Sequence, residues 1–272
     1  MVEDFNLNDF ITEVRHGGLQ CIVLAPSRGG KSHLVGTYPG KILYLCGSGE
    51  LHGIKSAFKE SGDSLVPVCW DRNKDGSGRS PDAAYEFILK LLRNPGYLKE
   101  QGFQMVALDS MVALFKTIRG TQRWANKCQT DRGKHNSFAE PDAYMDMIDA
   151  ILIELRNLCD LHEIDYIVTS DLEIQQQGDD GSIIMSKPRM PSFSVAERTI
   201  QQFPDVIMLS RMKVGKKSGP VIQMGAGCTR ESKNEAGVIV KTIDFTPSLA
   251  DVTDIPEKIK ADLKEILKLK GR

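Results

Sequence analysis

The chain of 272 residues is long enough to bury a sizeable hydrophobic core, and its 41% hydrophobic and 26% charged residues are typical of a globular protein. Its formal net charge of -1 excludes a wholly basic protein that packages nucleic acid, although a local basic loop remains compatible with it. No apolar run approaches the ~20 residues that cross a bilayer, and the acidic first residues lack the plan of a secretory signal. We therefore expect a cytoplasmic protein without a membrane partner.

Short apolar runs alternate with helical patterns along the first part of the chain. Five runs rich in Val, Ile and Leu are apolar on both faces, as buried strands of a parallel sheet must be: Leu19–Ala25, Lys41–Cys46, Leu65–Trp70, Met105–Asp109 and Tyr166–Thr169. Helical patterns lie between them at Lys31–Thr37, Ile54–Glu60, Ala83–Leu92 and Asp142–His162. This alternation predicts an α/β fold in which crossover helices flank a mostly parallel sheet.

The pattern changes after Thr169. Strand-like runs follow at Val206–Arg211, Val221–Met224 and Val238–Phe245, and Val214–Pro220 is typical of a hairpin turn. We therefore expect antiparallel strands at the C-terminal edge of the sheet. The chain is predicted to form a single domain over residues 1–272, with its core at about 19–245 and a charged amphipathic helix at about 255–270.

Three segments are poor in regular signals. Residues 71–81 are expected to form a surface loop, and residues 119–140 and 174–196 are longer than most connections in a compact domain. Loops of that length are usually functional or disordered. We expect both long loops to be irregular.

The strongest chemical signal follows the first strand and opens a helix. It matches the phosphate-binding loop G-x-x-x-x-G-K-[ST], with alanine in place of the first glycine. Backbone N–H groups here can wrap a triphosphate, while the lysine reaches the terminal phosphates and the serine hydroxyl ligates Mg²⁺. We include the next residue, His33, in the segment, although its place inside the helix favours packing. The predicted ATP-binding residues are Ala25, Pro26, Ser27, Arg28, Gly29, Gly30, Lys31, Ser32 and His33.

Asp109 is the second element of the predicted site. It ends a buried apolar strand, so its carboxylate emerges at the carboxyl edge of the sheet, where α/β folds bind ligands. Such a carboxylate helps to hold Mg²⁺ in many P-loop ATPases, and we predict Ser32 and Asp109 as the metal-binding pair. The six scattered cysteines show no C-x-x-C pair, which argues against a zinc site.

The run Val106–Leu114 (VALDSMVAL) resembles the second nucleotide motif of the RecA-type recombinase ATPases. In that family the strand after the P-loop helix ends near a glutamate that polarises the attacking water, and the resemblance makes Glu50, which follows Ile42–Cys46, its counterpart here. Lys31, Glu50 and Asp109 are then the expected catalytic residues. A polar sensor follows the fifth strand in the family, which implies nucleotide contact by Ser170 or Asp171. This chain carries Asp171 where the family usually has glutamine, and a carboxylate repels phosphate unless metal or water intervenes.

The resemblance covers about residues 19–240 in order and spacing, and the compact size looks most like phage-encoded RecA-like ATPases of the Sak-type single-strand annealing group. Such a protein acts in the host cytoplasm. The resemblance implies single-stranded DNA as a partner and self-association into a ring or filament, with a single-strand DNA-binding protein as a possible further partner.

Basic and aromatic residues in the two long loops favour DNA contact, because cations neutralise phosphates and aromatic rings stack on bases. The candidates are Arg119, Arg123, Trp124, Lys127, Arg132, Lys134, Lys187, Arg189 and Phe193. A second basic cluster matches a late region that in RecA-like filaments reaches the ATP of the neighbouring subunit: Lys213, Lys216, Lys217, Arg230 and Lys233. Lysines in an exposed hairpin also serve solubility alone.

The leading hypothesis is a DNA-dependent ATPase that assembles on single-stranded DNA and promotes annealing or strand exchange in recombination, repair or replication. A helicase or packaging motor on the same core is one alternative. A nucleotide-binding loader or regulator that acts with a protein partner without turnover is the other.

Overall fold

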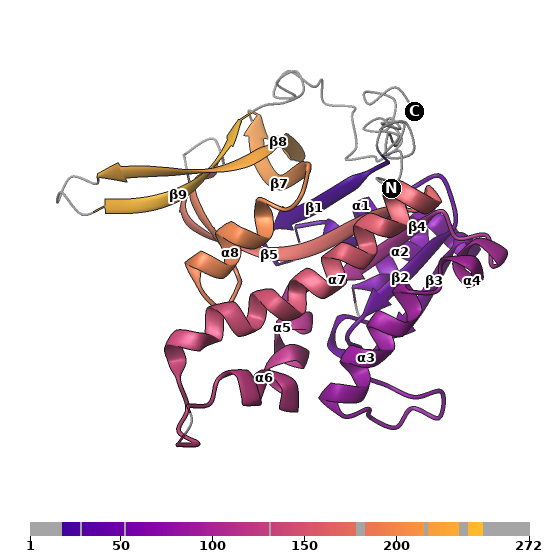
Figure 1. Ribbon diagram of the computed structural model, residues 1–272. Helices are drawn as coiled ribbons and strands as arrows, with labels where there is room; N and C mark the ends of the chain where they lie inside the picture. The colour runs from indigo at the N-terminus through magenta and orange to yellow at the C-terminus, as the bar shows by residue number, and fades with distance from the viewer. Residues whose placement is uncertain are drawn as a thin grey trace, which may run out of the picture.

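The computed structural model describes residues 18–27, 29–51, 53–130, 132–177, 183–214, 217–233 and 239–246. At residues 56, 60, 174–177, 183–187, 208, 210–214, 217–233 and 239–246 it describes the backbone alone. Within these ranges the strands form one sheet, and helices pack on both of its faces (Figure 1). The predicted α/β fold is confirmed.

Six strands form the parallel part of the sheet. They are β1 (Gln20–Ala25), β2 (Ile42–Cys46), β3 (Leu65–Cys69), β4 (Met105–Asp109), β5 (Asp165–Gln177) and β7 (Asp205–Val214). Their order across the sheet is β3-β2-β4-β5-β1-β7, and every neighbouring pair is parallel. The five runs expected from the sequence therefore lie side by side, and their carboxyl ends share one edge. The expectation that all five are buried on both faces was wrong for β3, which lies at the edge of the sheet and is buried only at Leu65.

Three further strands have antiparallel neighbours. β6 (Ile183–Pro188) pairs with β5, β8 (Lys217–Lys233) pairs with β7, and β9 (Ile239–Thr246) pairs with β8. Val214 is the register partner of Lys217 at the close of the β7–β8 hairpin. The helix expected at about 255–270 lies outside the described residues.

Helices cover the two faces of the sheet unequally. One face carries α1 (Lys31–Gly36) and α2 (Ile54–Ser61). The other carries α3 (Pro81–Leu92), α4 (Pro95–Glu100), α5 (Met111–Arg119), α6 (Gln122–Lys127), α7 (Glu140–His162) and α8 (Phe193–Ile200). α7 starts two residues earlier than expected, because Pro141 fits the first turn of a helix. None of the described helices is long and apolar enough to span a membrane.

Alternating side chains of the central strands supply both layers of the core. On β1, Ile22 and Leu24 join the larger cluster beneath α3, α5 and α7, whereas Cys21 and Val23 join the smaller cluster beneath α1 and α2. All four side chains are fully buried. A strand buried on both faces must be apolar at every position, which is why these runs show no polar alternation in the sequence.

Two segments that we predicted to be irregular contain regular structure. Residues 119–140 hold α6 and a 3₁₀ turn, η4 (Ser137–Ala139). In residues 174–196, β5 continues to Gln177, β6 returns beside it, and α8 begins at Phe193. Side-chain caps start both helices: Thr121 Oγ1 accepts a hydrogen bond from Trp124 N at 3.1 Å, and Ser192 Oγ accepts one from Val195 N at 3.2 Å. The expectation of two irregular loops was wrong. Residues 71–80 form the predicted loop between β3 and α3, and Pro81 is already the first residue of α3.

Candidate functional site

The turn between β1 and α1 is shaped by two glycines. Gly29 N donates to Pro26 O at 2.8 Å, and a Cβ on Gly29 would lie 2.8 Å from the Ala25 Cβ. The missing side chain at Gly29 thus makes room for the alanine that replaces the first glycine of the motif. Gly30 has a φ of 94°, a left-handed conformation that favours glycine. The two glycines together let the chain turn from the sheet edge directly into α1.

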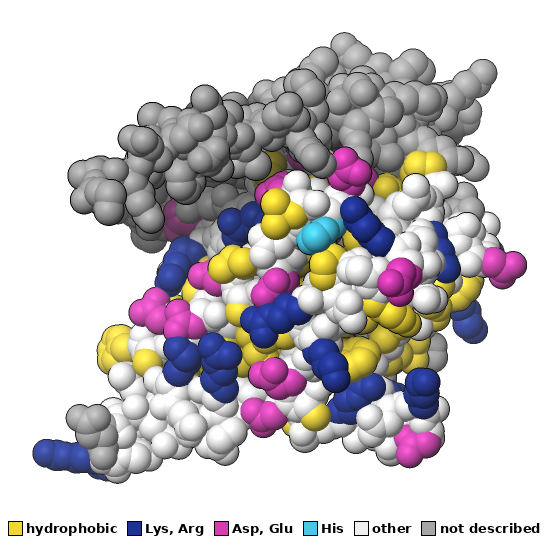
Figure 2. All heavy atoms as spheres, turned by 45° about the vertical axis from the view of Figure 1, so that its right-hand side comes forward, with side chains coloured by type: hydrophobic (Ala, Val, Ile, Leu, Met, Phe, Trp, Pro, Cys, Tyr) yellow, Lys and Arg dark blue, Asp and Glu magenta, His cyan; other side chains and the backbone are white. Residues whose placement is uncertain are grey.

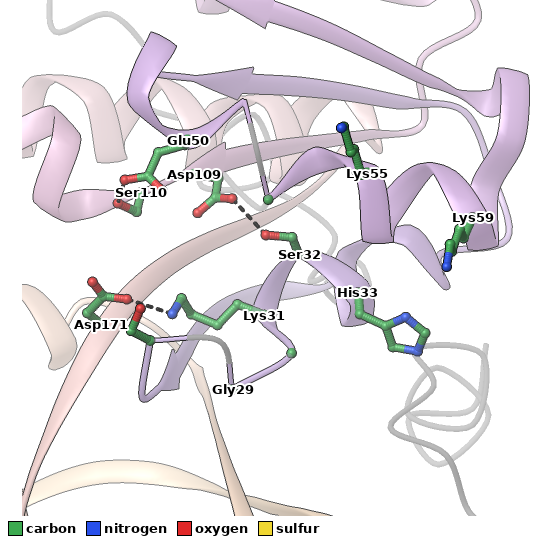
Figure 3. A pocket seen from close by; sticks show the side chains of 13 residues that line it. Gly29, Lys31, Ser32, His33, Glu50, Lys55, Lys59, Asp109, Ser110 and Asp171 are labelled. Carbon is green, nitrogen blue, oxygen red and sulfur yellow. Dashed lines mark hydrogen bonds and ion pairs between the residues drawn. The ribbon is translucent and has the colours of Figure 1, made fainter.

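Lys31 is the first residue of α1 and is nearly buried. Its ammonium donates to the carbonyl oxygens of Ala25 at 3.3 Å and Pro26 at 3.4 Å. A third contact crosses to β5, where Asp171 Oδ1 accepts from Lys31 Nζ at 2.6 Å (Figure 3). Lys31, which the motif assigns to phosphate binding, therefore packs against the backbone of the β1–α1 turn and forms an ion pair with the Asp171 carboxylate.

Ser32 and Asp109 meet across the pocket. Ser32 Oγ donates to Asp109 Oδ2 at 3.1 Å, and the carboxylate also accepts hydrogen bonds from Tyr44 OH and from Thr169 Oγ1. Asp109 is only 3% exposed. Burial, and then the negative charge of Asp109, raises the pKa of Tyr44, so the phenol stays a proton donor to the carboxylate.

The oxygen donors of Ser32 and Asp109 fit Mg²⁺, a hard cation that takes oxygen ligands and is commonly shared with substrate phosphates. The hydroxyl and the carboxylate are adjacent at the mouth of the phosphate-binding turn, on the same side as Lys31 (Figure 3). Bound there, Mg²⁺ would neutralise phosphate charge. Tyr44 and Thr169 hold Asp109 in place for this task, and the sequence analysis did not identify either residue.

Glu50 lies at the end of a 3₁₀ turn, η2 (Ser48–Glu50), that follows β2. Its Oε1 accepts a hydrogen bond from Ser110 Oγ at 3.3 Å, and Ser110 directly follows Asp109. Burial raises the pKa of Glu50 above its ordinary value of 4.5, the nearby Asp109 charge adds to this rise, and the Ser110 hydrogen bond opposes it. A carboxylate with a raised pKa, facing the phosphate-binding lysine across a pocket, has the properties of a general base.

These elements enclose one pocket of about 650 Å³ at the carboxyl edge of the sheet (Figure 3). The expected residues Ser27, Gly29, Gly30, Lys31, Ser32, His33, Glu50, Asp109 and Asp171 line it. His33 is half-buried and points away from Asp109 in Figure 3. The sequence analysis missed Lys55 and Lys59, one helical turn apart on α2, which add two cations to the lining.

Some expected nucleotide contacts are not part of the pocket lining. Ala25 and Ser170 are fully buried, and Ser170 Oγ has no hydrogen-bond partner within the described structure. Because neighbouring residues of a strand face opposite sides, β5 directs Thr169 to Asp109 and Asp171 to Lys31, while Ser170 between them lies inside the fold. Pro26 contributes its carbonyl oxygen to Lys31, and Arg28 lies outside the described residues.

Trp124 does not have the position that we expected. It is only 6% exposed, and its ring centroid lies 5.4 Å from that of Tyr144 on α7. Its indole Nε1 is buried without a hydrogen-bond partner in the part of the chain that the structure describes. The capped helix α6 turns this side chain into the core, so the prediction that Trp124 stacks on a DNA base was wrong.

The other candidates of residues 119–140 remain at the surface. Arg119, Arg123, Arg132 and Lys134 are exposed, and Lys127 forms an ion pair with Asp146 of α7. Phe138 in η4 is 93% exposed. On the coloured part of the face shown in Figure 2, Lys and Arg side chains are interspersed with Asp and Glu side chains and form no continuous basic patch.

The remaining predicted nucleic-acid residues lie on the β6–α8 segment. Arg189 is exposed directly after β6, and Phe193 is half-buried at the start of α8. Lys187 belongs to β6, and its side chain is outside the description. The same holds for Lys213 of β7 and for Lys217, Arg230 and Lys233 of β8, while Lys216 lies outside the described residues altogether.

No protein-family model matches the chain, and no curated protein is significantly similar to it. Among solved structures, one similar chain is a prototypical ATPase from the type III secretion system of pathogenic bacteria, with 16% sequence identity and a TM-score of 0.44. The alignment covers 71% of this chain and 52% of that one, so this chain spans about half the length of the similar structure. The functional argument below therefore depends on the site itself.

Proposed function

We propose that the protein binds ATP with Mg²⁺ and hydrolyses it. The observation that carries this proposal is the convergence of Lys31, Ser32, Asp109 and Glu50 on one pocket from three separate parts of the sequence. A P-loop lysine, a hydroxyl–carboxylate pair and a base are the parts that phosphoryl transfer to water requires. They meet at the carboxyl edge of the parallel strands, where ligands bind in α/β folds.

Each residue has a distinct task in this scheme. The backbone N–H groups of the turn and Lys31 bind the phosphates, while Ser32 and Asp109 would hold the metal. Glu50 accepts a proton from the attacking water, and the Ser110 hydroxyl orients its carboxylate. Asp171 holds Lys31 until phosphate takes over the ammonium.

The finer proposal is an ATPase that acts on single-stranded DNA in annealing or strand exchange and self-associates as a ring or filament. The resemblance of the Val106–Leu114 motif to RecA-type recombinases supports it, as do the exposed cations of residues 119–134: Arg119, Arg123, Arg132 and Lys134. Phe138 replaces Trp124 as the aromatic candidate for base stacking, because its ring is almost fully exposed.

A coupling route between nucleotide and DNA follows from the course of β5. This strand carries Asp171 beside Lys31 and then continues into the β5–β6 hairpin. Arg189 N donates to Asp171 O at 2.8 Å, which ties the end of that hairpin to the residue that contacts the P-loop lysine. If ATP tightens DNA binding through this route, DNA must tighten ATP binding by the same factor.

The experiment is ATP turnover with Mg²⁺, measured with and without single-stranded DNA, alongside electron microscopy of the same samples. The proposal expects turnover that DNA stimulates and assemblies that form on DNA. Nucleotide binding without turnover favours a loader or regulator, and directional unwinding of duplex DNA favours a helicase.

DNA contact is tested by its salt dependence. Affinity is expected to fall with added salt, and the combined Arg119→Ala, Arg123→Ala and Arg132→Ala variant is expected to flatten the slope by about 0.7 for each phosphate that the protein no longer neutralises. The matched control replaces Lys90, an exposed lysine of α3, by alanine. Equal salt slopes in the wild-type protein, the triple variant and Lys90→Ala would assign Arg119, Arg123 and Arg132 to protein contacts.

A further inference from the structure

A carboxylate from the turn that follows β3 holds the start of the turn that carries Glu50. Ser48 N donates to Asp71 Oδ1 at 2.9 Å and to Oδ2 at 3.0 Å, and Ser48 Oγ donates to Oδ2 at 2.7 Å. Ser48 is the first residue of η2, and the first N–H of a helical turn has no partner within the turn. Asp71 supplies that partner, and hydrogen bonds to an ionised acceptor are stronger than neutral ones.

Asp71 is itself fixed on both sides. The preceding residue, Trp70, is fully buried, and its N donates to Cys46 O at 3.1 Å at the end of β2. The Trp70 indole Nε1 donates to Thr117 Oγ1 of α5 at 3.2 Å. On the other side, Arg79 N donates to Asp71 O at 2.8 Å across the loop. The carboxylate therefore has a defined position before any nucleotide binds.

Glu50 is thus anchored at two points. Its backbone belongs to the short turn that Asp71 caps, and its carboxylate accepts the Ser110 hydrogen bond. Asp71 is not among the residues that line the pocket, and the hydrogen bonds described for its carboxylate all come from Ser48 of this turn. Losing the cap frees the start of the turn two residues before Glu50.

We infer that Asp71 is a positioning residue for hydrolysis: it orders the Ser48–Glu50 turn and so places the Glu50 carboxylate for water activation. This inference rests on the proposed ATPase function. Small displacements of a catalytic group have large kinetic effects, because a shift of about 1 Å can cost about 100-fold in rate.

The first test separates turnover from binding. Asp71→Ala is expected to lower kcat for ATP hydrolysis by about 10- to 100-fold while the Kd for ATP stays within about twofold of wild type. Asp71→Asn keeps one acceptor oxygen and is expected to recover part of the loss. Ser48→Ala removes the hydroxyl contact but keeps the backbone contact, so its kcat should also lie between those of the wild type and Asp71→Ala. The matched control is Asp75→Ala, since the hydrogen bonds described for the Asp75 carboxylate come from Ser77 within the same exposed loop.

The second test does not depend on activity. Amide hydrogen exchange over residues 46–51 is expected to become about tenfold faster in Asp71→Ala, and to stay unchanged in Asp75→Ala, because only the former removes a charge-assisted hydrogen bond from this turn. Unchanged exchange, unchanged kcat, or a parallel loss of ATP affinity would overturn the inference. If the wild-type protein does not hydrolyse ATP, the proposed function fails, and hydrogen exchange still decides whether Asp71 orders the turn.

Discussion

Lys31 Nζ lies 2.6 Å from Asp171 Oδ1, although the two residues are 140 positions apart in the sequence. The pair is partly shielded, with side chains 10% and 26% exposed. A triphosphate that binds the P-loop must therefore compete with this carboxylate for the lysine.

Removing that competition is expected to strengthen nucleotide binding. Asp171→Asn keeps the size of the side chain but removes its charge, and we expect ATP to bind about tenfold more tightly, the effect of about 1.4 kcal/mol. Asp171→Glu retains the charge and is the control. Calorimetric titration with Mg²⁺ and ATP measures both. Weaker binding by Asp171→Asn would show that the carboxylate helps Lys31 to meet phosphate.

Glu50→Gln is expected to separate binding from catalysis. The amide keeps the shape and can still contact Ser110, but it cannot accept the proton from water, so turnover should fall by about 100-fold or more. The ATP affinity should stay close to that of wild type. Single-turnover kinetics measure the rate of hydrolysis, and equilibrium titration measures the Kd for ATP. Wild-type turnover in this variant would assign the base to another residue, with Asp171 the next candidate.

The pH dependence of turnover is expected to report on Glu50. The base form is needed, and burial raises its pKa above 4.5, so kcat/KM should fall as the pH drops through that raised value. The Ser110 hydrogen bond lowers this pKa, and Ser110→Ala should therefore move the acidic limb to higher pH. If the acidic limb of the kcat/KM profile does not shift in Ser110→Ala, a group other than Glu50 determines the pKa of that limb.

Trp124 and Phe138 are expected to respond in opposite ways. Trp124→Ala removes a buried ring and should lower the free energy of unfolding by about 3–5 kcal/mol. Phe138→Ala should leave stability unchanged and weaken single-stranded DNA binding by about 1–3 kcal/mol. Chemical denaturation and DNA titration of both variants check this. An unaltered DNA affinity in Phe138→Ala would remove base stacking from the proposal.

Local sequence signals were enough for the central strands and the phosphate-binding turn. Strands such as β1 and β4 are apolar at nearly every position. A short apolar run between two helical patterns is typical of a buried strand in a parallel sheet. Ser32 and Asp109 could be paired in advance because the phosphate-binding motif assigns the serine hydroxyl to Mg²⁺ and Asp109 ends a strand at the edge of the sheet where ligands bind. Glu50 was placed only through the family resemblance, and the structure brings it to the pocket.

Contacts between segments that are distant in the sequence could not be predicted from such local signals. Trp124 is buried against Tyr144 of α7, which lies 20 residues further along the chain. The ion pair between Asp171 and Lys31 forms because alternate side chains of β5 point to opposite sides of the sheet. Polar partners such as Tyr44 for Asp109 look like ordinary strand residues in the sequence. A closer search for caps would have found α6 and α8, since Thr121 and Ser192 precede their first turns.

The most direct test of a nucleotide site at Lys31 is the Kd for ATP in the presence of Mg²⁺, compared between the wild-type protein and Lys31→Ala. We predict that Lys31→Ala weakens binding by about 10- to 100-fold or more, because hydrogen bonds to a charged phosphate disappear, while the protein remains folded despite the loss of the ion pair with Asp171. Lys90→Ala should bind ATP like wild type. Equal ATP affinity in a folded Lys31→Ala protein would contradict the assignment of this pocket to nucleotide.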